Sequence, residues 1–158
     1  MLLLSALGAL GAILLLAPSW YRRFQCWRWR RALKVPKHQK TFQQLYQFID
    51  GYAVSCKERA LHQAPEYVYG EIEFESFLAL IGLTRPTADT VFYDLGSGAG
   101  KAVLACAMVY NMAYYAGIEL FESLHACATA QQESLKKNQH YLANAQKVQF
   151  IHGDFLAI

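Results

Sequence analysis

The chain has 158 residues, 54% of them hydrophobic, and a formal net charge of +3. This length allows one ordinary domain and an additional apolar segment. Four scattered cysteines, with no C-x-x-C pair, exclude a recognisable zinc site and a disulfide framework. The charge is divided, because residues 1–40 hold eight basic and no acidic residues, whereas residues 41–158 hold seven basic and twelve acidic ones.

The apolar segment lies at the N-terminus. Residues 1–17 carry no charge, and Pro18–Tyr21 extends them with two aromatic residues. A helix of about 20 apolar residues crosses a bilayer, so Leu2–Tyr21 predicts a transmembrane signal anchor over residues 1–21. A cleaved signal peptide is the alternative, but here the positive charge follows the apolar run. The positive-inside rule then predicts a single-pass membrane protein whose C-terminal domain is cytoplasmic.

A basic segment with interleaved aromatics follows over residues 22–40 and begins "RRFQCWRWRR". Such a composition suits either nucleic acid or anionic lipid. Because the segment adjoins a predicted span, Arg22 to Lys40 is interpreted as a juxtamembrane segment held by anionic lipid, and nucleic acid is the less favoured partner.

Residues 41–83 predict a helical lead-in to the main domain. Apolar residues at helical spacing predict one helix over Thr41–Ala60, which Thr41 could cap. Gln63–Glu71, with one proline and one glycine, predicts a loop. Glu71–Leu83 predicts a second helix with Ile72 among its inward residues, and the turn Thr84–Asp89 follows.

Residues 84–158 alternate between strands and helices. Short β-branched and aromatic runs predict three strands, with "TVFYDL" as a buried one; a glycine turn and a helix follow the first strand, and a second helix follows the next. The ranges are Thr90–Leu95, Lys101–Asn111, Ala113–Leu120, Phe121–Ala143 and Lys147–Leu156. This βαβαβ order predicts an α/β fold, the N-terminal part of a doubly wound Rossmann-like sheet with three parallel strands.

The glycine turn "DLGSGAGK" decides between ligand classes. A P-loop is excluded, since Leu95 stands at its first glycine and Ala102 at its Ser/Thr. A dinucleotide fingerprint fits poorly, because Lys101 is bulky where a helix and a strand must pack closely. The remaining pattern places Asp94 before three glycines. A carboxylate there can receive an ammonium group, and S-adenosylmethionine carries both an ammonium and a sulfonium.

Two further acids end strands at the same sheet edge. Glu119 follows the last glycine by about 20 residues, where an acid can bind ribose hydroxyls. Asp154 ends the third strand in "HGDF". Acids at strand ends also serve as helix caps or solvated loop residues, but three in register favour a binding site.

These motifs together carry a family resemblance. "VYGEIEFESFL", "FYDLGSGAGKAVLACA", "AGIEL" and "IHGDFL" resemble successive motifs of the non-SET lysine methyltransferases of the disruptor-of-telomeric-silencing type. These are class I, S-adenosylmethionine-dependent enzymes whose known substrate is a nucleosomal histone lysine. The resemblance covers residues 65–156 and implies a partial S-adenosylmethionine-binding domain over residues 84–158.

The resemblance implies a role for each matching residue. The loop Tyr69, Gly70 and Glu71 would close over the methionine part of the cofactor. Asp94 would hold the ammonium, with the turn of Gly96, Ser97, Gly98 and Gly100 beneath it. Glu119 would take the ribose hydroxyls, Asp154 would accept from the adenine amino group, and Phe155 would stack on the ring. No catalytic residue and no metal ligand is assigned.

The chain also departs from this family. It stops after the third strand, so the strand that bears Asp94 is expected to have one unpaired edge. We expect a truncated enzyme with low or no activity by itself. A membrane-anchored class I lysine methyltransferase acting on membrane-protein complexes is one alternative. A non-enzymatic, membrane-tethered module that binds a partner is the other.

Overall fold

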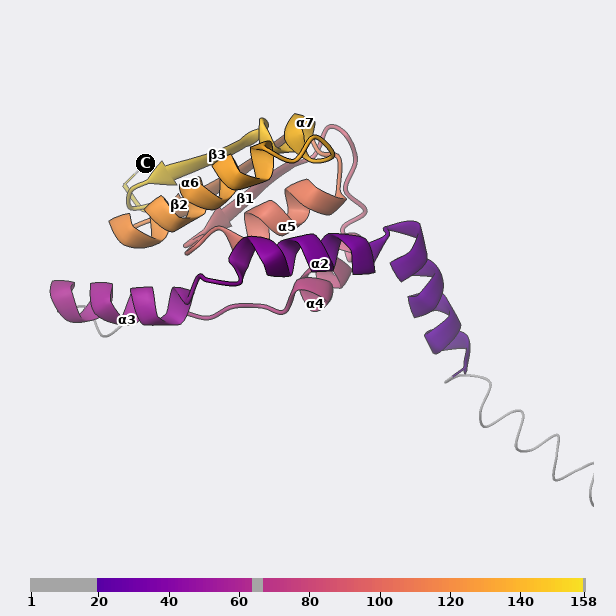
Figure 1. Cartoon of the computed structure of the whole chain (residues 1–158), viewed down its shortest axis with the longest axis horizontal. Coiled ribbons are helices and arrows are strands. Elements are labelled where there is room, and N and C mark those ends of the chain that lie inside the picture. The colour runs from indigo at the N-terminus through magenta and orange to yellow at the C-terminus, as the bar shows by residue number, and fades with distance from the viewer. Residues whose placement is uncertain (1–19, 64–66, 158) are drawn as a thin grey trace, which may run out of the picture. The chain divides into compact units, whose positions relative to one another are not determined.

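The computed structural model describes residues 20–63 and 67–157 (Figure 1). The chain divides into two compact units, Met1–Pro36 and Lys37–Ile158. In the first unit, residues 20–32 form a helix. Its exposed aromatics are spaced so that Trp20 stacks on Phe24, with ring centroids 6.2 Å apart, and Phe24 on Trp27, at 6.0 Å.

The predicted localisation in a membrane needs correction. Among the residues that the structure describes, no helix is both long enough and apolar enough to cross a bilayer. The helix of residues 20–32 carries five arginines, whose burial in lipid would be costly. The predicted span Leu2–Tyr21 lies outside the described residues except for its last two positions. The single-pass topology, and the lipid contacts predicted for Arg22 to Lys40, therefore have no support.

Three helices precede the sheet: α2 (Val35–Tyr46), α3 (Gly51–His62) and α4 (Phe74–Leu83). The single helix predicted over Thr41–Ala60 is wrong, because Asp50 caps a new helix by accepting a 2.9 Å hydrogen bond from the Ala53 amide. Thr41 lies inside α2 and does not cap it. The next helix begins later than predicted, since Glu73 caps α4 through the Ser76 amide, and Ile72 is exposed.

The remaining elements alternate as the sequence predicts. They are β1 (Val91–Leu95), α5 (Lys101–Val109), β2 (Tyr114–Glu119), α6 (Glu122–Lys136), the short α7 (Leu142–Ala145) and β3 (Val148–His152). The sheet is parallel in the order β1-β2-β3, with Asp94 opposite Gly117 and Glu119 opposite His152. The prediction of a three-stranded parallel sheet is confirmed, and β1 is an edge strand of the described sheet. The long helix predicted over Phe121–Ala143 is two helices.

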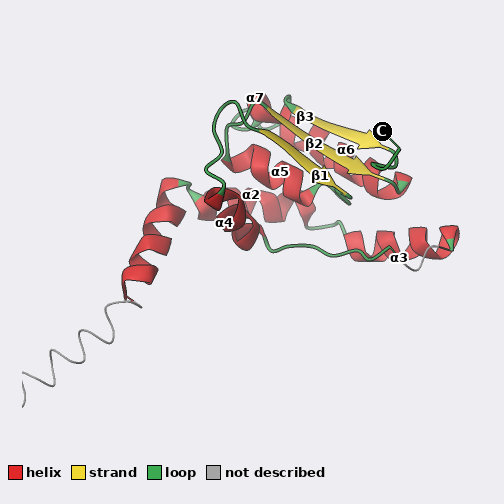
Figure 2. Ribbon diagram, turned by 180° about the vertical axis from the view of Figure 1, so that it is seen from behind, coloured by secondary structure: helices red, strands yellow, loops and turns green. Residues whose placement is uncertain are grey.

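The two faces of the sheet differ. In Figure 1 the helices α5 and α6 lie in front of the strands, and Figure 2 shows the opposite face with the strands in front. The core lies on the helical side, where Tyr115, Leu104 and Leu124 are almost completely buried. On the other side, side chains of β1 at alternate positions are about half exposed: Val91, Tyr93 and Leu95. The prediction that β1 is a buried strand is therefore wrong for one face.

Candidate functional site

The glycine turn between β1 and α5 is the floor of the site. Gly96, Gly98 and Gly100 all have positive φ, a conformation that other residues adopt at a cost. The amides of Gly96 and Ser97 both donate to the carbonyl of Ile118, at 2.8 and 3.0 Å, so the turn is attached to β2. A Cβ atom on Gly100 would lie 2.5 Å from the Phe150 ring, whereas one on Gly96 would meet nothing within 4 Å. Gly96 therefore leaves open space above the floor.

Glu119 connects this floor to the start of α6. Its side chain is 6% exposed, and its two carboxylate oxygens accept from the backbone amides of Gly98, at 2.7 Å, and Phe121, at 2.8 Å. Hydrogen bonds to a charged acceptor are among the stronger ones in proteins. Glu119 is therefore part of the structure of the turn. Each carboxylate oxygen still has a lone pair for one further donor.

Asp94 lies at the end of β1 beside the turn and is half-buried. Within the described part of the chain, its carboxylate has no hydrogen-bond partner and no ion pair. Burial raises its pKa above the ordinary value of 3.8, and the nearby charge of Glu119 raises it further. An unpaired carboxylate in such surroundings is costly, so a cation that pairs with it would be bound favourably.

The loop of residues 67–73 lies against the turn through Tyr69. The Tyr69 ring occupies the space over Gly98, where a Cβ atom would come within 2.7 Å of the ring. The Tyr69 hydroxyl reaches Gly51 at the start of α3 and donates a 2.6 Å hydrogen bond to Glu71. Burial and this hydrogen bond both raise the pKa of Tyr69, so its hydroxyl stays protonated and can donate. Two glycines from different elements thus provide the space for Tyr69.

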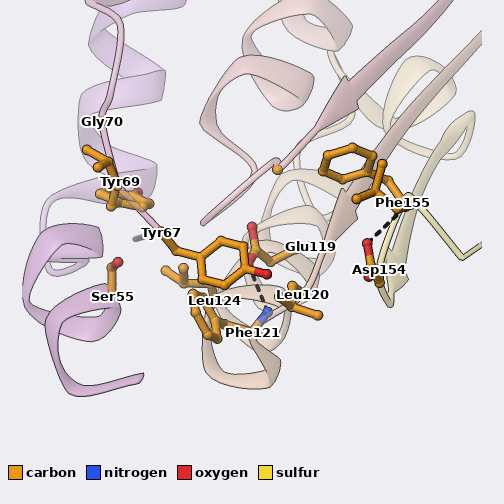
Figure 3. A pocket seen from close by; sticks show the side chains of 13 residues that line it. Ser55, Tyr67, Tyr69, Gly70, Glu119, Leu120, Phe121, Leu124, Asp154 and Phe155 are labelled. Carbon is orange, nitrogen blue, oxygen red and sulfur yellow. Dashed lines mark hydrogen bonds between the residues drawn. The ribbon is translucent and has the colours of Figure 1, made fainter. Parts of the chain in front are cut away.

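A first cavity, of about 190 Å³, opens at the carboxyl edge of the sheet (Figure 3). Tyr69 and Ser55 lie on one side of it, Asp154 and Phe155 on the other, and Glu119 lies between them. Phe155 is 44% exposed, and the Asp154 carboxylate accepts from the Leu156 amide at 2.9 Å. The cavity therefore combines an exposed aromatic ring with two carboxylates that retain acceptor capacity.

A second cavity, of about 340 Å³, adjoins the first. Asp94, Ser97 and Lys101 line it, together with Glu71 from the loop. Tyr69, Gly70 and Gly96 line both cavities. The Ser97 hydroxyl is buried with no hydrogen-bond partner among the described residues. The two cavities together form an elongated site, with Asp94 on one part and Asp154 on the other.

All of the predicted site residues except Gly100 line one or both cavities. The set is Tyr69, Gly70, Glu71, Asp94, Gly96, Ser97, Gly98, Glu119, Asp154 and Phe155. Gly100 lies below, against Phe150 and Ala128. The structure therefore brings these residues to one place, while their roles towards a ligand stay predictions.

Sequence reasoning missed several residues of the site. Ser55 lines the first cavity from α3, and Lys101 lines the second from the start of α5. Tyr46 of α2 donates to the carbonyl of Ala99 at 3.0 Å, so the helix adjoins the turn. Gly51 provides the space for the Tyr69 hydroxyl. The one available signal was Gly51 itself, because an isolated glycine within a helical pattern often marks a helix end or a close approach.

Comparisons with solved structures give partial similarities to methyltransferases. An RNA methyltransferase from Salinibacter ruber, in complex with S-adenosyl-L-homocysteine, is 26% identical over 56% of this chain and 53% of that one, with a TM-score of 0.43. A SAM-dependent methyltransferase from Thiobacillus denitrificans, in complex with the same molecule, is 25% identical over 58% and 34%, with a TM-score of 0.43. YjhP from E. coli is 24% identical over 57% and 34%, with a TM-score of 0.45. The chain thus spans between a third and about half of these structures.

The family comparison covers more of the chain. The family described as "Histone methylation protein DOT1" matches residues 52–157, which include α3, the loop, the glycine turn and all three strands. This match contains every predicted site residue and both cavities, and it agrees with the resemblance seen in the motifs. The chain belongs to the DOT1 histone methylation family.

Proposed function

We propose that the chain is an S-adenosylmethionine-dependent methyltransferase whose acceptor is a protein lysine. The observation that carries the proposal is Asp94, a half-buried carboxylate without a described partner, next to the open space over Gly96. Membership of the DOT1 family supports both the cofactor and the acceptor class.

The donor set of the site fits this cofactor. An ammonium group would be paired with Asp94, and the Gly96 backbone would allow the amino-acid chain to approach closely. Glu119 can accept from two hydroxyls, because each of its oxygens uses one lone pair on a backbone amide. Asp154 and Phe155 would hold an aromatic base, one by accepting from its amino group and the other by stacking.

The cofactor, when bound, would supply an electrophilic methyl group. The protein's own contribution is then to align an amine with that group and to keep water away from it. Tyr69 and Gly70 lie where the two cavities meet, so the loop would cover the middle of an elongated ligand. A lysine amine that attacks must be neutral, and its proton leaves to solvent after transfer.

Binding is tested first, by titration calorimetry of the full chain with S-adenosyl-L-homocysteine. We expect binding to the wild-type chain and a loss of about tenfold or more in Asp94→Asn, since a hydrogen bond to a charged group contributes about 1.5–3 kcal/mol. Asp89→Asn is the matched control, because Asp89 is exposed in the turn before β1. A wild-type chain that does not bind this molecule would contradict the proposal and favour a non-enzymatic module.

The acceptor class is tested separately, by incubating the chain with S-adenosylmethionine and a histone octamer. Mass spectrometry should locate new methyl groups on lysine side chains, and Asp94→Asn should lose them. An octamer whose lysines have been dimethylated chemically is the control substrate. If cofactor binding is found but no histone lysine is methylated, the lysine acceptor is wrong and the cofactor site still stands.

A further inference from the structure

Lys101 has an arrangement that the proposed cofactor site does not by itself explain. It is the first residue of α5, a position where a positive charge opposes the helix dipole. Its ammonium donates a 2.5 Å hydrogen bond to Glu71 and lies 5.3 Å from the centre of the Tyr46 ring. About a quarter of the side chain is exposed, and it lines the second cavity with Asp94. Helix stability does not account for a lysine here, so its charge must serve another contact.

The charges around the two cavities are unequal. Glu71, Glu119, Asp94 and Asp154 supply the negative charge. Among the described residues that line either cavity, Lys101 is the single lysine or arginine. An amino-acid end carries an ammonium and a carboxylate on the same carbon. A site with Asp94 for the ammonium therefore needs one cation nearby for the carboxylate, and Lys101 is in the same cavity.

In the structure, Glu71 is paired with this cation. Its two carboxylate oxygens accept from the Lys101 ammonium and from the Tyr69 hydroxyl. Within the described part of the chain, residues 67–72 make no backbone–backbone hydrogen bond. The loop is therefore held at the turn by side chains, and chiefly by the contacts of Tyr69 and Glu71. Releasing one ion pair would release that end of the loop.

We propose that Lys101 binds the carboxylate of the ligand's amino-acid end and that Glu71 holds this position until the ligand displaces it. Binding is then an exchange of one carboxylate for another on the same ammonium. Lys101 becomes a specificity-determining residue that selects ligands with a complete amino-acid end. The inference rests on the proposed cofactor site and adds to it a ligand-operated release of the loop.

The experiment compares two ligands by titration calorimetry with the full chain. One is S-adenosyl-L-homocysteine and the other is its decarboxylated analogue, which keeps the amine and the adenosine. The wild-type chain should prefer the first. Lys101→Met should bind it about tenfold or more weakly and should lose the preference, because charged hydrogen bonds of this kind are strong. Lys101→Arg should keep the preference.

Glu71→Gln separates exchange from simple positioning. If Glu71 competes with the ligand, its neutralisation should tighten binding of S-adenosyl-L-homocysteine by roughly 1.4- to fivefold, the range for a partly exposed ion pair. The decarboxylated analogue should not gain. Lys136→Met is the control for loss of a lysine, since Lys136 pairs with Glu133 on the exposed part of α6.

Two results would overturn the inference. One is a Lys101→Met chain that still prefers the ligand with the carboxylate. The other is a Glu71→Gln chain in which binding of S-adenosyl-L-homocysteine is unchanged or weaker, because the ion pair would then only position the loop. Failure of the wild-type chain to bind either ligand would instead contradict the proposed function, so the two failures are distinguishable.

Discussion

The floor and the loop of the site are built in different ways. The floor, residues 96–100, has three positive-φ glycines and is attached to β2 and α6 through the Ile118 carbonyl and the Glu119 carboxylate. The loop, residues 67–72, is attached by the side chains of Tyr69 and Glu71. Backbone geometry and buried contacts resist change, whereas partly exposed side-chain contacts exchange easily. The comparison indicates a rigid lower surface and a part that can respond to a ligand.

The largest effect is expected where the floor has no space. Gly100→Ala should destabilise the chain by about 2–4 kcal/mol, because the new Cβ would clash with Phe150 and because Gly100 has φ +78°. Chemical denaturation would measure this. Gly70→Ala is the matched control in the loop, since nothing lies within 4 Å of its added Cβ, and it should change stability by less than about 0.5 kcal/mol. Equal losses in both variants would refute the distinction.

The next effect concerns the attachment of the floor to α6. Glu119→Gln should lower stability by about 1–3 kcal/mol, because an amide has one oxygen to accept from Gly98 and Phe121 and would place its NH₂ group against the other N–H. Thermal and chemical unfolding would both report the loss. A variant as stable as the wild-type chain would show that the floor does not depend on this carboxylate.

Asp94 should have the opposite effect on stability. Its pKa is raised in the folded chain, so stability from this group is lost as pH rises from below 3.8 through the raised pKa. Asp94→Asn removes that cost and should raise the unfolding midpoint at neutral pH, although it weakens ligand binding. The difference from the wild-type chain should disappear below pH 3.8. A lower midpoint at neutral pH would indicate that Asp94 stabilises the free chain.

The same pKa predicts how binding depends on pH. An ionised Asp94 is needed to pair with an ammonium, so affinity for S-adenosyl-L-homocysteine should fall as pH is lowered through the raised pKa of Asp94. Titration calorimetry across this range would show it. Asp94→Asn should lose this part of the pH dependence, and a profile identical to that of the wild-type chain would assign it to another group.

The smallest effect is expected in the loop. Tyr69→Phe removes the hydroxyl that donates to Glu71 but keeps the ring over Gly98. Global stability should fall by only about 0.5–1 kcal/mol. Hydrogen exchange should be faster in residues 67–72 and unchanged in the floor. Faster exchange in both segments would mean that the loop and the floor form one unit.

Much of the sheet could be predicted because its signals are local. Short β-branched runs separated by a glycine turn and by helices predict three parallel strands, and the strand ends then place Asp94, Glu119 and Asp154 at one edge. The helices before the sheet were harder. The break at Asp50 depends on one capping carboxylate, which a continuous apolar periodicity over Thr41–Ala60 obscured.

The sequence by itself determined the family, the strand order and the acids of the site, since these depend on motifs and on the short-range rules of βαβ connections. Only the tertiary structure decided what each group contacts. Lys101 reaches Glu71 across 30 positions of the chain, and Glu119 reaches Gly98 across 21. Tyr69 needs space at two glycines of different elements. Such contacts follow from how the elements pack, because side-chain reach and available space have no local pattern in the sequence.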